Sequence, residues 1–313
     1  MNVVGLLKNP VSMAQVKSAW RSTASQRGYF MGWNLKTLLV NRAGHEAWFK
    51  EAKVADIGNN DVVRNAAYLS PSYFDVSNDV EFDGIVGAQE ISWHPSGSFN
   101  GATHAEPTLE DFPAVEAALV NHSEVIAYQG RTLEQAAAQV RALLDATKNG
   151  LTYKFITICV GEERDLHFRD ISEAQKTTLA VRYVKKQVRT ILELAEVTEE
   201  EMHRIGFAYE PRGAIQVGEV KGKTPSIEHC RALGWATLQA VAEVVGLEGM
   251  RQMFTLQYGG SMKGPEDETN AVQRFVGPGN EVDEDLFNGG LVGTASKKVE
   301  TVVSINVQLN PER

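Results

Sequence analysis

The sequence predicts an α/β fold in the form of a (β/α)8 barrel preceded by an N-terminal extension. Eight short apolar segments of strand length alternate with helix-like segments between residues 29 and 305. Such alternation favours parallel strands joined by right-handed helical crossovers, and eight repeats favour closure of the sheet into a barrel. The 313 residues are enough for one large barrel. We therefore divide the chain into an extension, residues 1–28, and a barrel domain, residues 29–313.

The expected elements follow from apolar periodicity along the chain. Residues 11–22 are helix-prone, and we expect this part of the extension to pack on the outside of the barrel. The strands are short apolar runs, expected at residues 29–36, 65–69, 84–91, 117–120, 155–160, from 205 onward, 253–257 and 289–292. The helices have one apolar face and are expected at residues 43–55, 132–147, 171–194 and 226–245, with a final helix that carries Lys297 and Lys298.

Composition and charge narrow the class of protein. Hydrophobic residues make up 43% and charged residues 23% of the chain, the balance of a globular protein with a core. The net charge of -9 argues against a nucleic-acid partner, which would favour a basic surface. No apolar run approaches membrane-spanning length, and the first residues lack the apolar segment of a secretory signal. Cys159 and Cys230 do not have the spacing of a disulfide framework, so we expect a cytoplasmic protein without a membrane partner.

Polar side chains with catalytic chemistry follow several of the expected strands. Asn34 and Lys36 end the first strand on one face. His122 and Glu124 follow the fourth strand. Glu210 ends the sixth, directly before a proline that biases it away from helical geometry. Since barrel sites are built at the carboxyl ends of strands, a base, an imidazole and an ammonium group can meet there around one small ligand.

Each of these residues also has an ordinary interpretation when it is taken singly. His122 can be a structural hydrogen-bonding residue, and Glu210 an exposed acid in a strand-to-helix connection. Lys36 can stand where a strand runs out into solvent. The enzymatic interpretation therefore depends on whether the three side chains converge.

Glycine-containing turns follow the last two strands. One contains Gly259, Gly260 and Ser261, and the other contains Gly293 and Thr294. Glycine lets backbone N–H groups approach an anion closely, so these turns are candidates for a phosphate site. The alternative is that both are ordinary tight turns.

A long loop follows the third strand, from Trp93 to Thr103. It is rich in small residues and also carries Trp93 and Phe99. Loops with large apolar side chains often dock on another surface, so this loop is expected either to contact a second subunit or to fold back on its own barrel.

The chain resembles the triosephosphate isomerase family along nearly its whole length after residue 28. Seven short motifs carry the resemblance: Gly-Trp-Asn-Leu-Lys at 32–36, Gly-Ala-Gln at 87–89, His-Ser-Glu at 122–124, Cys-Val-Gly-Glu at 159–162, Tyr-Glu-Pro at 209–211, Tyr-Gly-Gly-Ser at 258–261 and Leu-Val-Gly-Thr-Ala-Ser at 291–296. Each motif is weak alone. Seven in the right order at the right strand ends make a specific signal.

The resemblance implies a cytoplasmic, cofactor-free enzyme of glycolysis with a TIM-barrel fold. It would interconvert dihydroxyacetone phosphate and glyceraldehyde 3-phosphate through an enediolate. Glu210 matches the family's catalytic base, and His122 matches the electrophile that hydrogen-bonds the two substrate oxygens. Lys36 matches the cation that stabilises the developing negative charge, with Asn34 beside it, and Glu124 matches the acid after the histidine.

The resemblance also implies a phosphate site and a second subunit. The substrate phosphate would be bound by backbone groups at Gln216, Gly260, Ser261, Gly293 and Thr294. The protein would be a homodimer in which the loop from Trp93 to Thr103 reaches the partner. No metal ion is implied.

Several positions depart from the family pattern. In the lid, from Arg212 to Gly218, Gly213 replaces the tryptophan of the hinge and Gln216 replaces a glycine. Thr294 replaces a glycine of the phosphate site. These changes spare the chemistry but alter the lid and the phosphate end. Two alternatives therefore stay open: an isomerase of a four-carbon ketose phosphate such as an erythrulose phosphate, and a sugar-phosphate-binding barrel without catalysis.

Overall fold

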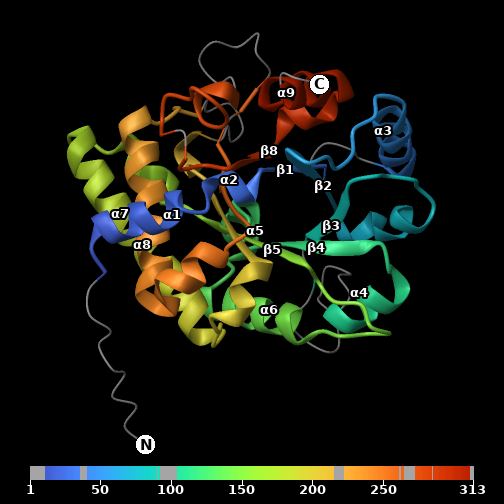
Figure 1. Ribbon diagram of the computed structural model, residues 1–313, viewed down its shortest axis with the longest axis horizontal. Helices are drawn as coiled ribbons and strands as arrows, with labels where there is room; N and C mark the ends of the chain where they lie inside the picture. Colours follow the sequence, from blue (N-terminus) through green and yellow to red (C-terminus); the bar gives the residue numbers. More distant parts are fainter. Residues whose placement is uncertain are drawn as a thin grey trace, which may run out of the picture.

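A computed structural model gives the structure of this chain. It describes residues 11–35, 41–89, 91, 104–214, 222–260, 262–263, 272–283 and 285–310. Eight parallel strands pair in sequence order, and the eighth closes the sheet by pairing with the first (Figure 1). Helices surround the closed sheet, so the predicted (β/α)8 barrel is confirmed.

The strands are short and buried along almost their whole length. Their bounds are β1 Tyr29–Asn34, β2 Val63–Leu69, β3 Ile85–Gln89, β4 Val115–Val120, β5 Phe155–Val160, β6 Ile205–Tyr209, β7 Thr255–Tyr258 and β8 Gly289–Val292. The expected ranges of the fifth and eighth strands agree with the structure, whereas β4 begins at Val115, ahead of the expected residue 117. Glu116, which is only half-buried, interrupted the apolar run in the sequence and hid the start of that strand.

The helices follow the strands on the outside of the barrel. Their bounds are α1 Met13–Arg21, α2 Ala24–Arg27, α3 Arg42–Val54, α4 Ala105–Asp111, α5 Ser123–Gln129, α6 Leu133–Asp145, α7 Glu173–Leu194, α8 Ile227–Gln252 and α9 Val299–Leu309. Side-chain capping boxes begin α1, α6 and α7, and the cap of α6 is Thr132. Sequence periodicity did not find α4 and α5, because seven residues give too few turns for a helical pattern to stand out.

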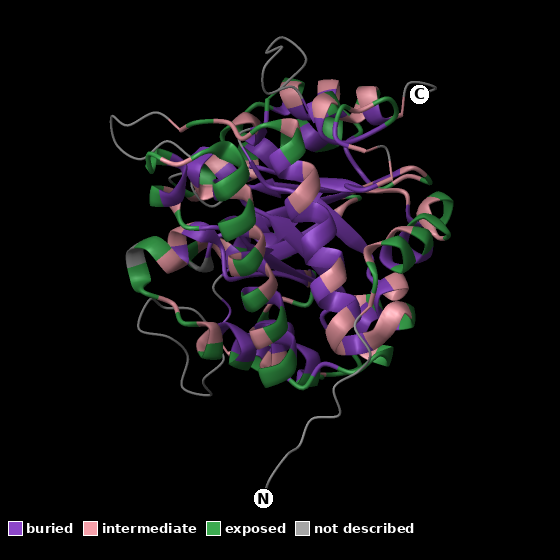
Figure 2. Cartoon of the chain, turned by 90° about the vertical axis from the view of Figure 1, so that its left-hand side faces the viewer, coloured by how far each residue is buried: buried purple, intermediate pink, exposed green. Residues whose placement is uncertain are grey.

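The barrel interior is filled, and aromatic rings pack its amino end. Phe30, Phe155 and Phe254 pack ring against ring near the amino ends of β1, β5 and β7, with centroids 4.9 to 5.5 Å apart. A second apolar layer lies between the strands and the helices. The strands at the centre are buried, and exposed residues lie on the outer helices (Figure 2). Because aromatic rings fill the amino end of the barrel, an active site is expected at its carboxyl end.

The N-terminal helix α1 lies against α8 and the segment that leads into β8 (Figure 1). Trp20 is fully buried, and its indole N–H donates to the carbonyl oxygen of Asp285 at 2.7 Å. Arg21 forms an ion pair with Asp283 at 2.9 Å. Between β7 and β8 the described residues contain only a short 3-10 helix, Val272–Arg274, so α1 covers a part of the barrel that has no long helix of its own there.

None of the helices in the described part of the chain combines the length and the apolar character needed to cross a membrane.

Candidate active site

Glu210 is fixed where three strands come close together. It follows β6 directly, and its backbone N–H donates to the carbonyl oxygen of Val160 on β5 at 2.8 Å. A Cβ atom at Gly161 would overlap the Glu210 carbonyl, and one at Gly259 would come within 2.9 Å of the Glu210 Cγ. Glycine at both positions therefore lets the carboxylate sit between the ends of β5 and β7.

Both oxygens of the Glu210 carboxylate have partners, although the residue is only 3% exposed. Oε1 lies 3.0 Å from Nε2 of His122, and Oε2 accepts the backbone N–H of Ser123 at 2.9 Å. Burial raises the pKa of Glu210, but the contact with His122 and the backbone N–H of Ser123 together hold that pKa below its usual range. The carboxylate is therefore ionised at neutral pH and able to accept a proton.

The turn after β4 aims His122 at this carboxylate. Asn121 adopts a left-handed conformation with φ 61°, and its side-chain amide donates to the carbonyl oxygen of Cys159 at 2.9 Å. His122 then caps α5, because the N–H of Glu124 points at its Nδ1 from 3.4 Å. That contact leaves Nδ1 unprotonated, so the proton of a neutral ring lies on Nε2, which faces Glu210.

Asn34 joins the same group from β1. It is 3% exposed, and its side-chain nitrogen lies 3.2 Å from Nε2 of His122. Gln89, the last residue of β3, is fully buried and donates to the Asn34 side-chain oxygen. The structure therefore brings Glu210, His122 and Asn34 together, as expected, and adds Gln89, which the sequence analysis had only as part of a motif.

The other predicted residues either lie beyond hydrogen-bonding distance of this group or fall outside the described residues. The Glu124 carboxylate lies 3.9 Å from Nδ1 of His122, beside the ring but beyond hydrogen-bonding distance. Lys36, Gln216 and Ser261 lie outside the described residues. So do the loop from Trp93 to Thr103 and most of the predicted lid, of which the structure describes Arg212–Ala214.

The two glycine turns lie at the carboxyl ends of adjacent strands, β7 and β8. Gly260 follows β7, and its carbonyl oxygen accepts the N–H of Met262 at 2.8 Å. Gly293 begins a short 3-10 helix, Thr294–Lys297, and a Cβ atom added there would meet nothing within 4 Å among the described residues. Within that part of the chain the space beside Gly293 is open, at the same end of the barrel as Glu210.

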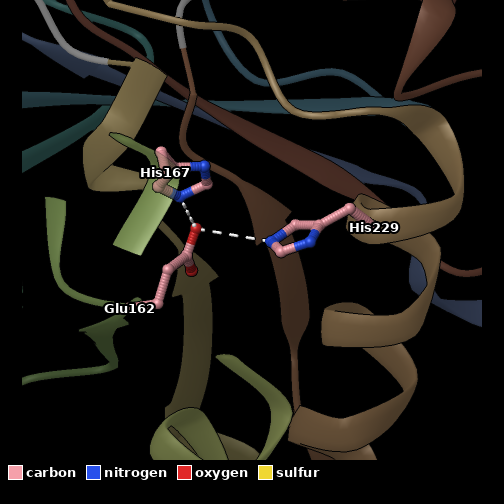
Figure 3. Close-up of side chains that lie close together, drawn as sticks. All are labelled: Glu162, His167 and His229. Atoms are coloured by element: carbon pink, nitrogen blue, oxygen red, sulfur yellow. Dashed lines mark hydrogen bonds and ion pairs between the residues drawn. The ribbon is translucent and has the colours of Figure 1, made fainter. Parts of the chain in front are cut away.

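A second group of titratable side chains lies beside the first (Figure 3). The carboxylate of Glu162, just after β5, lies between the rings of His167 and His229. Its Oε1 is 2.5 Å from Nε2 of His167 and 3.5 Å from Nε2 of His229, and it accepts the Tyr209 hydroxyl at 3.1 Å. All three members of the group are buried. Burial raises the pKa of Glu162, but the contacts with His167 and His229 lower it to about 2.

Sequence reasoning did not assign a role to any member of this second group. Glu162 was noted only within a motif, and His167 and His229 were not noted. His167 lies in a 3-10 helix, Arg164–Phe168, and His229 lies in the first turn of α8. Glu162 and His167 are close in the sequence, but His229 lies far from both, so only the fold could bring all three together.

The chain is therefore a closed (β/α)8 barrel of the kind whose active sites lie at the carboxyl end, and the carboxylate–imidazole pair there is able to transfer protons. The chain belongs to the triosephosphate isomerase family, since the model of that family, Triosephosphate isomerase, matches residues 31–308. The predicted resemblance is confirmed.

Individual relatives share about a third of the sequence. A triosephosphate isomerase of Corynebacterium diphtheriae is 30% identical over 210 residues, which cover 67% of this chain and 68% of the relative. One of Streptomyces coelicolor is 33% identical over 219 residues, covering 70% of this chain and 72% of the relative. One of Treponema denticola is 28% identical over 246 residues, covering 77% and 85%. At this level of identity the chain is a divergent member of the family.

Proposed function

We propose that this protein is an aldose–ketose isomerase that interconverts dihydroxyacetone phosphate and glyceraldehyde 3-phosphate. The reaction moves one proton between adjacent carbons through an enediolate. The observation that carries the proposal is the 3.0 Å contact between the buried Glu210 carboxylate and Nε2 of His122 at the carboxyl end of the barrel. Proton abstraction next to a carbonyl requires a base and a hydrogen-bond donor that reach the same small molecule, and this pair supplies both.

Glu210 acts as the base in this proposal. Its lowered pKa keeps the carboxylate ionised at neutral pH. With both oxygens paired to His122 and Ser123, it cannot attack a substrate C–H bond without giving up at least one of these contacts. Substrate binding therefore has to exchange a contact within the protein for a contact with the reacting carbon.

His122 donates from Nε2 to the substrate oxygens. The N–H of Glu124 at Nδ1 supports a neutral ring with its proton on Nε2. This is the established argument for the catalytic histidine of triosephosphate isomerases, which we apply here to His122. Asn34 and Gln89 form a buried amide pair, and the Asn34 end of the pair lies beside the ring.

The remaining roles are assigned by family membership. Lys36 stabilises the developing negative charge, Asn34 lies beside it, and Glu124 is the acid next to His122. Gln216, Gly260, Ser261, Gly293 and Thr294 bind the phosphate, which the open space beside Gly293 supports. The protein acts in the cytoplasm as a homodimer, with the loop from Trp93 to Thr103 at the interface.

A second candidate substrate is a four-carbon ketose phosphate such as an erythrulose phosphate. The hinge region supports it: Gly213 stands where the family carries tryptophan, and the ring of His167 fills the space that a larger side chain at Gly213 would need. A changed hinge alters how the lid covers the far end of a substrate, while the chemistry at Glu210 stays the same.

A coupled spectrophotometric assay with each sugar phosphate tests the proposal. Turnover of the three-carbon pair supports the first candidate, and turnover of the four-carbon substrate alone replaces it with the second. No turnover of either would favour a sugar-phosphate-binding barrel without catalysis. Glu51→Asp, an exposed position on α3, serves as the matched control for variants of Glu210.

A further inference from the structure

We propose that Glu162, His167 and His229 bind a divalent metal ion of the zinc class, as a structural site beside the lid hinge. The three side chains come from three separate elements: the end of β5, the 3-10 helix Arg164–Phe168 and the start of α8. One ligand atom from each lies within 4.8 Å of the other two. In Figure 3 one carboxylate oxygen of Glu162 lies between the two rings, and a ring nitrogen of each histidine faces it.

Among the described residues, some polar atoms of this cluster have several partners and others have none, and a bound cation would give the unpaired atoms a partner. Three groups surround Oε1 of Glu162, namely His167, His229 and the Tyr209 hydroxyl. Oε2 of Glu162 is buried, and so is Nε2 of His229, yet neither has a hydrogen-bond partner within the described part of the chain. Buried polar atoms are usually paired, because leaving one unpaired costs about 1–3 kcal/mol.

The charge of the cluster also favours a bound cation. Glu162 is fully buried. Its partners among the described residues are two imidazoles and a hydroxyl, and none of these carries a permanent positive charge. A buried carboxylate needs a compensating charge, and a bound cation supplies it without protonating either ring.

The donor set selects the kind of ion. Two imidazole nitrogens and one carboxylate oxygen suit zinc, which they contact at about 2.0–2.2 Å, whereas calcium and magnesium favour oxygen ligands. Ligand atoms of a tetrahedral site at those lengths lie roughly 3.3 Å apart. The Glu162–His229 separation of 3.5 Å is close to this, and the Glu162–His167 separation of 2.5 Å would have to open by less than 1 Å. The Tyr209 hydroxyl or a water molecule would complete the shell.

A supporting contact orients one of the ligands. Nδ1 of His229 lies 2.8 Å from the hydroxyl of Thr177 on α7. If Nδ1 donates to that hydroxyl, the lone pair of Nε2 points toward the cluster, which is the usual orientation of a metal-bound histidine.

The position of the site gives the ion a role. Tyr209, which contacts Glu162, directly precedes Glu210. A side chain larger than glycine at Gly213 would overlap the ring of His167. The hinge therefore packs directly against one of the three proposed ligands. A bound ion would hold the end of β5, the hinge and α8 together and would take no part in the proton transfer.

The test uses the full chain with any affinity tag removed, dialysed against a chelator and then titrated with zinc alone. We expect one equivalent of zinc per chain by elemental analysis. At a free zinc concentration of about 100 Kd, binding would raise the melting temperature by roughly 4 °C. Cobalt should bind at the same stoichiometry and show tetrahedral visible bands without a thiolate charge-transfer band, which excludes ligation by the neighbouring Cys230.

Variants locate the ion. His229→Gln should weaken zinc binding by at least about 100-fold, since even supporting residues of such sites contribute 10- to 100-fold. His203→Gln, at an exposed histidine whose Nδ1 lies beside the backbone carbonyl of Glu200, should bind as the wild type does. The wild-type titration does not depend on whether a variant folds. The proposal is overturned by less than 0.1 equivalent of zinc with no change in melting temperature, by a thiolate band, or by equal losses in the two variants.

Discussion

Glu210 and Glu162 are two buried carboxylates that follow neighbouring strands, β6 and β5, and each faces imidazole. Glu210 has one partner on each oxygen, His122 on Oε1 and the Ser123 N–H on Oε2. Glu162 has three groups around Oε1 and none on Oε2 within the residues described. Two buried carboxylates can therefore have different roles, which depend on their hydrogen-bond partners.

The difference lies in how the partners are arranged. The Glu210 pair can exchange its contacts for a substrate one at a time, because each oxygen has one partner. The Glu162 group gathers two imidazole nitrogens and a carboxylate within 4.8 Å of one another, a donor set that suits an ion. The first arrangement fits proton transfer, and the second fits a fixed structural centre. Variants that act on the surroundings of one carboxylate at a time distinguish these two arrangements.

The largest effect is expected at the imidazole that faces Glu210. His122→Gln removes the ring that donates to the developing oxyanion, and loss of one such donor lowers turnover by about 10²–10³-fold. The coupled isomerase assay measures this, and His203→Gln is the control at an exposed histidine. A His122→Gln enzyme that works within a few-fold of wild type would remove His122 from the mechanism.

Shortening the base should have the next largest effect. Glu210→Asp moves the carboxylate back by about 1 Å, which lowers kcat by about 10²-fold. Glu51→Asp makes the same chemical change at an exposed site and should leave kcat unchanged. Near-normal turnover by Glu210→Asp would refute its role as base.

A larger residue in the hinge next to Glu162 should lower the stability of the protein. Gly213→Ala places a methyl group against the ring of His167 and should lower the free energy of unfolding by about 1–3 kcal/mol. The double variant Gly213→Ala, His167→Ala frees that space, so the extra cost of the alanine at 213 should largely disappear. Urea denaturation of the four proteins measures the coupling. Additive losses would show that the two residues do not share one space.

The smallest effect concerns acid stability. The folded pKa of Glu210 is lowered, so its contribution to the free energy of unfolding is present above the unfolded pKa of about 4.3 and is lost as the pH falls through the folded pKa. Between pH 6 and pH 3 the wild type should therefore lose stability more steeply than Glu210→Gln. Urea denaturation at several pH values measures both slopes, and equal slopes would contradict the paired carboxylate.

The sequence was informative where one short segment carries the signal. The strands β5 and β8 have the predicted bounds, and Glu210, His122 and Asn34 stand at strand ends that a closed barrel brings to one face. Knowing the strand order was enough to place them together, because parallel strands all end on the same side.

What the sequence could not provide depends on contacts between distant segments. His229 meets Glu162 only because α8 packs beside the end of β5. Trp20 finds its hydrogen-bond partner at Asp285, near the other end of the chain, and no local pattern encodes that pairing. Gln89 was hidden for another reason: one amide at the end of a strand is too common to single out without knowing that Asn34 lies opposite.

Deuterium exchange tests the central claim most directly. The protein is incubated in heavy water with dihydroxyacetone phosphate, and proton magnetic resonance follows the carbon next to the carbonyl group; an erythrulose phosphate is run in parallel. We predict that the wild type incorporates deuterium at that carbon in at least one of the two substrates, and that Glu210→Gln does not. A folded wild-type protein that leaves both substrates undeuterated would contradict the assignment of Glu210 and His122 to proton transfer.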